Sequence, residues 1–181
     1  THMVARLPFV SILRQWTRPK MADSDAKARI VHISLDDPAL APRSPDIEHE
    51  RRVAIFDLIE GNHFSLIEGP EGPYRMMLSI ADRGILFALS DTDGAPLAKI
   101  ELSLTPLRRN IRDYFMICES YFEAIRTATP ERIEAIDQAR RALHNESAEI
   151  LQARLASQAS VDNDTARRLF TLICVLHFGG E

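Results

Sequence analysis

The sequence predicts an α+β fold, in which a small antiparallel β-meander packs against one helix from the first half of the chain and a three-helix block from the second half. Three short segments with strand-like composition follow one another between residues 74 and 104, and turn residues such as Asp93-Gly94 separate them. Helical periodicity dominates the chain after residue 105. A run of strands followed by a run of helices is typical of the α+β class.

Length and composition indicate one soluble globular domain. The chain has 181 residues, of which 45% are hydrophobic and 27% are charged, and its net charge is −4. Residues 1–20 carry four basic and no acidic side chains, so the remainder has a net charge of −8 (18 basic minus 26 acidic side chains). This balance disfavours a globally basic nucleic-acid-binding domain. We divide the chain into residues 1–28, a tag remnant with a basic N-terminal extension, and residues 29–181, a single α+β domain.

The N-terminal extension has no predicted fold of its own. Thr1 and His2 precede Met3 as the remnant of a cleaved purification tag would. Residues 7–16 form an apolar run that an arginine interrupts and that lacks a small-residue cleavage site, so they make a poor signal peptide. Either the native chain starts at Met21, or the extension is a basic amphipathic arm that docks on a surface or a partner.

The first half is expected to hold one strand and one helix before the meander. Residues 29–35 alternate well enough for a first strand, and a proline-rich connection follows. Ser44 and Pro45 mark a helix start, because a capping hydroxyl precedes a proline at the first helical position. Gly61 ends that helix. Residues 64–67 are a candidate for a short edge strand of the sheet.

The meander needs a cover on one face. Its strands are expected at residues 74–80, 85–89 and 96–104, with turns between them. Antiparallel sheets of this kind bury one face against other elements. The three C-terminal helices are expected to supply that cover.

Each C-terminal helix has a start signal. Thr105-Pro106 opens a helix to about residue 127, and Thr129-Pro130 opens a second helix to about residue 157. Asp162 or Asp164 caps the third. The third helix is apolar nearly all round, which predicts a buried helix at the centre of the core.

Arginines occupy positions that are unfavourable for cations. Arg108 and Arg109 lie in the first turn of one predicted helix, and Arg112 follows one turn later, although a helix amino terminus repels each cation by about 0.3–1 kcal/mol. Arg140 falls on the core-facing arc of the middle helix, with Arg141 just beyond it. Backbone N–H and guanidinium groups together commonly bind phosphate. The structural alternative is that Asp113, Glu119 or Asp137 holds Arg140, and that the arginines at the helix starts reach nearby acids such as Asp113, Asp162 or Asp164.

His144 is the candidate catalytic residue because of its neighbours on the middle helix. Asp137, Arg140 and Arg141 precede it by one to two helical turns on nearly the same face. An imidazole that Asp137 orients beside arginines is suited to act as a general base or a phosphoryl acceptor. The alternative is a partly buried structural histidine.

Several familiar chemistries are absent from the sequence. It contains no glycine-rich phosphate loop, dinucleotide-binding fingerprint, Cys-x-x-Cys pair, His-Glu-x-x-His motif or Gly-x-Ser-x-Gly elbow. Neither a metal site nor a cofactor is therefore predicted. Cys118 and Cys174 fall on predicted buried helices and are expected to be free thiols of a reducing cytoplasm. No stretch of about 18 apolar residues exists, so no membrane span is predicted.

Four long segments of the sequence carry a family resemblance. They are SPDIEHERRVAIFDLIE (residues 44–60), SLTPLRRNIRDYF (residues 103–115), EAIRTATPERIEAIDQARRALHNE (residues 123–146) and DTARRLFTLICVLH (residues 164–177). Together they resemble a bacterial family known as uncharacterised protein family 0262, over residues 29–177. The resemblance implies a bacterial cytoplasmic protein, and it carries over no catalytic or binding residue because that family has no established activity. Ser147 stands where the resemblance implies glycine, which matters if that helical turn closely approaches a ligand.

The leading hypothesis is a non-enzymatic binding or regulatory domain that recognises an anionic group on a phosphorylated ligand, an acidic protein surface or RNA. Its binding residues are the arginine cluster Arg108, Arg109, Arg112, Arg140 and Arg141. One alternative is an enzyme acting on a phosphate or carboxylate substrate, with His144 as the base and Asp137 orienting it. Another is a structural protein that forms a homodimer through exposed apolar surface.

Overall fold

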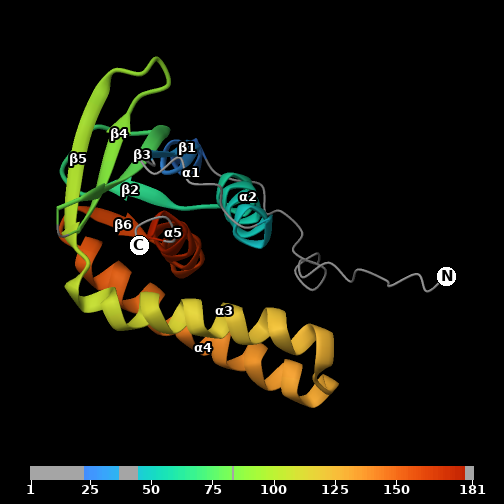
Figure 1. Ribbon diagram of the computed structural model, residues 1–181. Coiled ribbons are helices and arrows are strands. Elements are labelled where there is room, and N and C mark those ends of the chain that lie inside the picture. Colours follow the sequence, from blue (N-terminus) through green and yellow to red (C-terminus); the bar gives the residue numbers. More distant parts are fainter. Residues whose placement is uncertain (1–22, 37–44, 83, 178–181) are drawn as a thin grey trace.

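The computed structural model describes residues 23–36, 45–82 and 84–177 and has the α+β fold that the sequence predicts (Figure 1). Its elements are α1 (Asp23–Lys27), β1 (Ile30–Asp36), α2 (Pro45–Glu60), β2 (Phe64–Leu66), β3 (Tyr74–Ala81), β4 (Gly84–Ser90), β5 (Pro96–Ser103), the 3₁₀ turn η1 (Thr105–Leu107), α3 (Arg108–Thr127), α4 (Pro130–Leu155), β6 (Ala159–Val161) and α5 (Asn163–His177). α1 lies in the segment assigned to the N-terminal extension, so the structured part starts before residue 29. Residues 1–22 of that extension lie outside the described residues.

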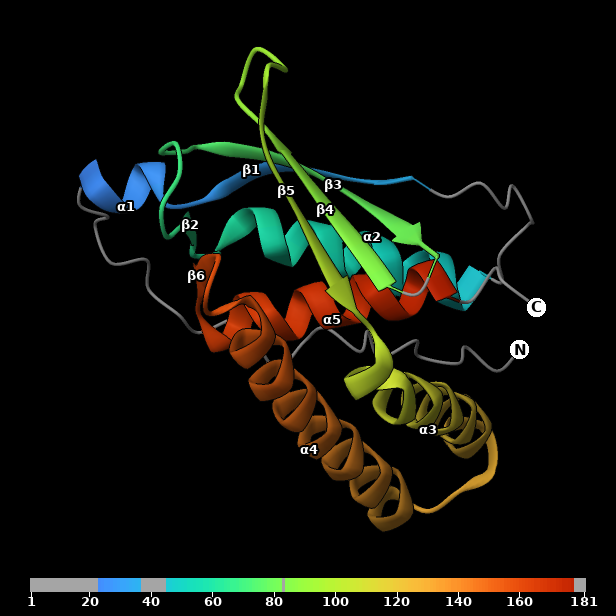
Figure 2. The same ribbon diagram turned by 90° about the vertical axis from the view of Figure 1, so that its left-hand side faces the viewer.

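Four strands form one sheet in the order β1-β3-β4-β5 (Figure 2). β3, β4 and β5 are the predicted antiparallel meander, with Leu78 opposite Phe87 and Phe87 opposite Ile100. β1 joins the edge of the meander parallel to β3, a pairing that the sequence did not specify. Parallel neighbours need a long crossover connection, and α2 lies within it.

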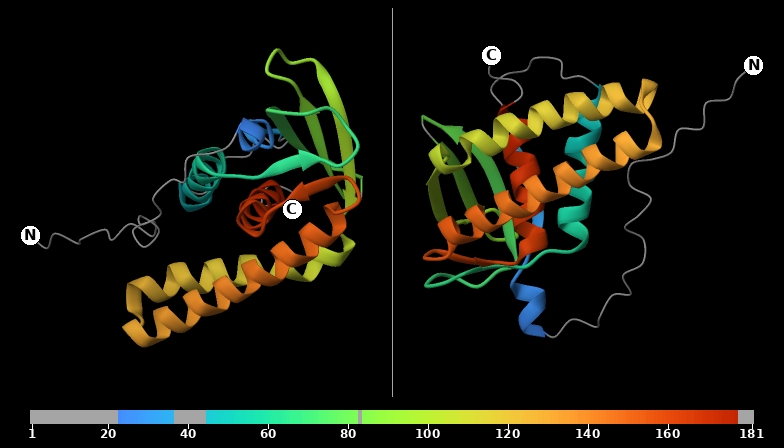
Figure 3. Two further views of the ribbon diagram at one scale, coloured as in Figure 1. Left: turned by 180° about the vertical axis from the view of Figure 1, so that it is seen from behind. Right: turned by 90° about the horizontal axis from the view of Figure 1, so that it is seen from below.

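Helix α5 lies between the sheet and the hairpin of α3 and α4 (Figures 1 and 3). Ten of its fifteen residues are buried, which confirms the predicted central helix. α2 lies beside α5 and completes the layer next to the sheet. The C-terminal helices therefore cover the sheet in two layers, with α5 against the strands and the α3–α4 hairpin behind α5.

The two faces of the sheet differ as the strand alternation predicts. The inward side chains are almost completely buried against α2 and α5, and include Met76, Leu78, Ile85, Phe87 and Ile100. The side chains between them point away from the helices. Figure 2 looks onto this outer face, and no helix of the described residues lies in front of it.

Residues 64–67 do not extend the meander, so their prediction as an edge strand of that sheet is wrong. β2 pairs instead with β6 in a separate antiparallel ribbon, with Ser65 opposite Ser160. The backbone N–H of His63 also donates to the Thr165 hydroxyl at 2.9 Å. The partner strand is far away in the sequence, and a three-residue strand has no periodic pattern of its own.

The described helices that follow the sheet begin at the predicted capping residues, with one difference. The side chain of Thr129 caps α4, and that of Asp162 caps α5. The helix predicted from Thr105 begins as the 3₁₀ turn Thr105–Leu107 and becomes α-helical only at Arg108. Ser44, the expected cap of α2, lies outside the described residues.

Asn62 joins the end of α2 to β1. Its Oδ1 accepts the Ile30 N–H at 2.7 Å, and its Nδ2 donates to the carbonyl oxygens of Ile30 at 2.8 Å and Leu58 at 2.7 Å. Ile30 and Leu58 are fully buried, so little water is available to replace the side-chain amide. This one side chain therefore satisfies three backbone groups at the junction of two elements.

Replacing Asn62 with alanine is expected to lower the free energy of unfolding by about 2–3 kcal/mol, because three backbone groups lose their partner. Asn62→Asp is expected to destabilise at least as much, since a carboxylate cannot donate to the two carbonyls. Urea unfolding followed by circular dichroism measures both variants. Asn145→Ala, at an exposed position of α4, is the control. A loss at Asn62 no larger than that of the control would contradict the role assigned to this amide.

Candidate functional site

The predicted site residues lie on the α3–α4 hairpin, whose helices run antiparallel (Figure 3). The Asn110 amide donates to the Ser147 hydroxyl at 3.0 Å, and that hydroxyl donates to the Leu143 carbonyl at 2.6 Å. Ser147 is fully buried in this helix contact. The position where the family resemblance implies glycine therefore faces α3.

Three of the five predicted arginines form an exposed basic surface at the start of α3. We call Arg108, Arg109 and Arg112 the α3 patch. The Nε atoms of Arg109 and Arg112 lie 3.5 and 3.8 Å from the two carboxylate oxygens of Asp113, and these arginine side chains are 81% and 71% exposed. No described residue forms a hydrogen bond or ion pair with the side chain of Arg108. One carboxylate thus pairs with two guanidinium groups while the third has no described partner, which leaves this surface positively charged.

The other two predicted arginines share Asp137 on α4. Nη2 of Arg141 lies 2.7 Å from Oδ2 of Asp137, and Nη2 of Arg140 lies 3.3 Å from Oδ1. Burial raises the pKa values of Glu50 on α2 and Tyr121 on α3, and the nearby charge of Arg140 opposes both rises. Arg140 therefore lies where α2, α3 and α4 meet. Its pairing is the internal arrangement that the sequence left open as the structural alternative.

Ion pairs divide the five arginines into two groups on the hairpin. The contact between Asn110 and Ser147 sets the level of the α3 patch along the hairpin. Arg140 precedes Ser147 by seven residues (147 minus 140), and this separation corresponds to about 10 Å along the helix axis. The arginines thus divide into an exposed group of three and a pair held by Asp137.

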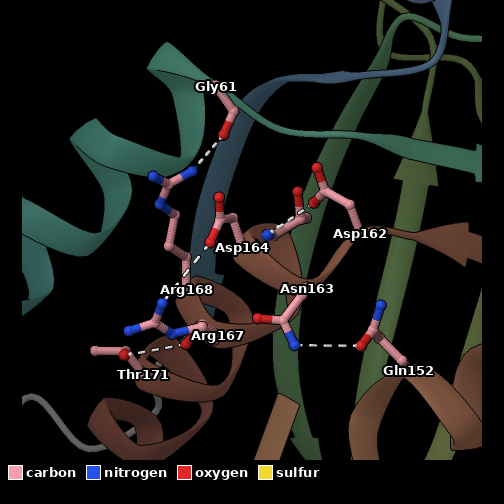
Figure 4. A network of polar contacts seen from close by, with 9 residues as sticks. Gly61, Gln152, Asp162, Asn163, Asp164, Arg167, Arg168 and Thr171 are labelled. Carbon is pink, nitrogen blue, oxygen red and sulfur yellow. Dashed lines mark hydrogen bonds and ion pairs between the residues drawn. The ribbon is translucent and has the colours of Figure 1, made fainter. Parts of the chain in front are cut away.

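The two arginines in the first turns of α5 are tied to neighbouring groups (Figure 4). Arg168 donates from Nη1 to the carbonyl of Gly61 at the end of α2. Arg167 lies 3.7 Å from the carboxylate of Asp164, and its carbonyl accepts the Thr171 hydroxyl at 3.2 Å. The Arg168 contact joins α5 to the end of α2, and the contacts of Arg167 lie within α5, so both arginines have a structural explanation.

His144 is enclosed between aromatic rings of α3 and α5. Its ring centroid lies 5.4 Å from that of Tyr114 and 6.0 Å from that of Phe170. Its Nε2 lies 3.3 Å from the hydroxyl of Thr171, and only 8% of the residue is exposed. The ring is therefore held by packing and by Thr171.

The electrostatic surroundings keep the imidazole neutral. Burial, followed by the charges of Arg140 and Arg167, lowers the pKa of His144 to about 3. Asp137, the residue expected to orient the ring, is instead engaged by Arg140 and Arg141. The structure thus separates the two predicted catalytic candidates into different polar contacts.

His144 is expected to make the fold sensitive to acid. Unfolded histidine titrates near pH 6.5, whereas the folded ring has a pKa of about 3, so the unfolded state takes up the proton first as the pH falls. The stability that depends on the neutral ring is complete above about pH 6.5 and is lost as the pH falls towards 3. The expected loss is about 2 kcal/mol between pH 6.5 and pH 5.

Urea unfolding of the wild type and of His144→Gln at pH 7.5 and pH 5 measures this loss. The wild type should lose about 2 kcal/mol more than the variant, because glutamine does not titrate. The comparison isolates His144 from Glu50, whose raised pKa favours the folded state at lower pH. Equal losses in the two proteins would show that His144 is not held neutral in the core.

The described residues contain neither a group of side chains placed to bind a metal ion nor a reactive cysteine thiol. Within residues 23–36, 45–82 and 84–177, no group of three or more His, Cys, Asp or Glu side chains is placed to hold a metal ion. No helix in these ranges is both long and apolar enough to cross a membrane. Cys118 and Cys174 are buried free thiols, and burial raises the pKa of Cys118 to about 11. Enclosed, protonated thiols are poor nucleophiles.

A groove of about 670 Å³ lies on the outer face of the sheet, and none of the predicted catalytic or ligand-binding residues lines it. We call it the sheet groove. Side chains of β1, β3, β4 and β5 and the β4–β5 turn line it, including Arg75, Met77, Ala88, Ser90 and Lys99. The signal that could have revealed it is the strand alternation near the β4–β5 turn, because the outward residues Ala88 and Ser90 of β4 are small while Arg75, Met77 and Lys99 on the neighbouring strands are long.

The fold and its surfaces define an α+β domain with a buried central helix and an exposed arginine patch. The chain belongs to the uncharacterised protein family UPF0262, whose family model matches residues 27–179. This confirms the resemblance that the sequence showed.

Its relatives match along nearly their whole length. The chain is 54% identical over 161 residues to a UPF0262 protein of Rhodospirillum rubrum, covering 89% of this chain and 98% of that protein. It is 54% identical over 158 residues to one of Ruegeria pomeroyi (84% and 98% covered) and 56% identical over 154 residues to one of Brucella canis (84% and 96% covered). No solved structure matches the chain.

Proposed function

We propose that the protein is a non-enzymatic binding or regulatory domain that recognises an anionic group through the α3 patch. The observation that carries the proposal is the charge imbalance on this surface. The guanidinium groups of Arg109 and Arg112 share the single carboxylate of Asp113, and Arg108 adds a third exposed guanidinium group that pairs with no described carboxylate. A phosphorylated ligand, an acidic protein surface and RNA all present the kind of group that this surface attracts.

The position of the patch on α3 adds to the attraction. No side chain caps the first turn of α3, and the Thr105 carbonyl of η1 already accepts the Arg108 N–H. The contribution of the helix start is therefore its partial positive charge. Guanidinium forks match phosphate and carboxylate groups in bidentate geometry. The exposed arginine side chains are therefore suited to an anion that is presented on a larger partner.

In the proposed function, the other predicted residues stabilise the domain and do not bind the ligand. They are Asp137, Arg140, Arg141 and His144. Asp137 already neutralises one of the two charges of Arg140 and Arg141, and the Arg140 side chain is only 19% exposed. A general base must reach the proton that it removes from a bound substrate. His144 is enclosed and neutral, so an enzymatic role for it has less support than anion binding.

Replacing Arg108 and Arg109 together with alanine is expected to weaken the binding of pyrophosphate, used as the probe, by about tenfold, because two of three guanidinium groups are removed. Binding is measured by titrating ¹⁵N-labelled protein and following amide signals. In the wild type, the signals of residues 105–113 are expected to shift first.

Arg126→Ala with Arg132→Ala is the matched control, because it removes the same charge from exposed positions at the other end of the hairpin. This control is expected to bind pyrophosphate as the wild type does. Circular dichroism confirms that each variant is folded. If the Arg108 and Arg109 variant binds as well as the control, the α3 patch is not the anion site.

A further inference from the structure

We infer that the sheet groove is a second binding site, which takes an extended acidic segment of a partner protein. The groove is built by β1, β3, β4 and β5, and it shares no residue with the α3 patch. The inference therefore goes beyond the proposed function and stands on different contacts.

The hollow exists where β4 has two short outward side chains, those of Ala88 and Ser90; the longer Leu86, the next outward residue, does not line it. The strand register places Ala88 of β4 between Met77 of β3 and Lys99 of β5, and it places Ser90 beside Arg75 of β3. Long side chains on both neighbouring strands thus flank a floor of small ones. The result is a trough that runs along β4.

The β4–β5 turn closes one end of the trough and is braced internally. Oδ1 of Asp91 accepts the backbone N–H groups of Asp93 and Ala95, both at 2.9 Å. Gly94 has a φ of 89°, which glycine adopts without strain. Asp93 and Gly94 line the groove, so this wall is already formed before any ligand binds. A preformed wall lowers the entropy cost of binding.

Arg75 and Lys99 give the groove its charge. Neither side chain has a hydrogen bond or ion pair with a described residue. Asp93 is the one acidic side chain in the groove lining, and His32 adds an imidazole on the same face. The two unpaired cations therefore favour an anionic occupant.

The spacing of the two cations fits a peptide. Arg75 lies opposite Ser90 and Lys99 lies opposite Ala88, so the two cations are offset by two residues along β4. Two residues of an extended chain span about 7 Å. The two cations also stand on opposite flanks of β4, so their long side chains reach over the trough from β3 and β5. Carboxylates at alternate positions of an extended peptide point to the same side, and when they face the floor they lie between the two cations.

The shape of the trough selects against other occupants. β3 and β5 are about 10 Å apart across β4, which is narrower than a helix with its side chains, about 10–12 Å. None of the lining residues is Phe, Tyr or Trp, the side chains on which single-stranded nucleic acids stack. Small ligands usually bury about 70% or more of their surface, whereas this face is open (Figure 2). An extended acidic segment is narrow enough for the trough, needs no aromatic side chains for stacking, and can bind to an open face.

Fluorescence anisotropy with a short labelled peptide that alternates glutamate and threonine tests the inference. The matching glutamine–threonine peptide is the neutral control. The wild type is expected to bind the acidic peptide and not the neutral one, and added salt should weaken the binding. Arg75→Glu with Lys99→Glu is expected to weaken it by about tenfold or more, because two attractive charges become repulsive.

Two further variants test whether peptide binding depends on the shape and the position of the groove and not only on the net charge of the protein. Ala88→Phe fills the floor without changing the charge and should also weaken the acidic peptide. Arg126→Glu with Arg132→Glu makes the same charge change on the hairpin and should have little effect. The alanine variant of Arg108 and Arg109 should keep peptide binding, so failure of the α3 patch and failure of the groove are distinguishable.

Four results would overturn the inference. The first is no binding by the wild type at peptide concentrations on the order of millimolar. The second is wild-type affinity in both groove variants. The third is that an oligothymidylate binds the wild type more tightly than the peptide does, and that the groove variants weaken its binding. The fourth is a wild-type dimer in solution that the groove variants convert to a monomer, since a second copy would then occupy the groove.

Discussion

Helix α5 is apolar around almost its whole circumference, and the rest of the structure is arranged to keep water away from it. Burying one large apolar side chain stabilises a protein by roughly 1.5–3 kcal/mol, so a helix of this kind requires neighbours on every side. The sheet and α2 cover one side, and the α3–α4 hairpin covers the other (Figure 1). The inner face of the hairpin is consequently committed to packing, and its outer surface and the outer face of the sheet are what the domain has left for binding.

Elements with a local signal could be predicted from the sequence. The helices showed apolar periodicity with capping residues such as Thr129 and Asp162, and the meander strands showed turns between them. Pairings between distant segments could not be predicted in this way. β1 lies parallel to β3, and β2 pairs with β6, because the fold brings these segments together. Nothing within a three-residue strand indicates its partner.

The candidate sites show the same division. Helical periodicity correctly placed Arg140 on an inward arc, but its contact with Asp137 at 3.3 Å depends on side-chain conformation. His144 attracted attention because of charged neighbours on one helix, whereas its environment is decided by Tyr114 and Thr171 from two other helices. The sheet groove was missed because its shape needs the register of three strands.

The central position of α5 also has a consequence for the order of events during biosynthesis. It leaves the ribosome after every other described element, yet Arg168 on it donates to the carbonyl of Gly61, and the preceding β6 completes the ribbon with β2. Contacts between such distant segments form slowly. Until α5 has been synthesised, the nascent chain therefore lacks this cover for the apolar face of its meander, with Phe87 and Ile100, and transiently exposed apolar surface of this kind favours aggregation.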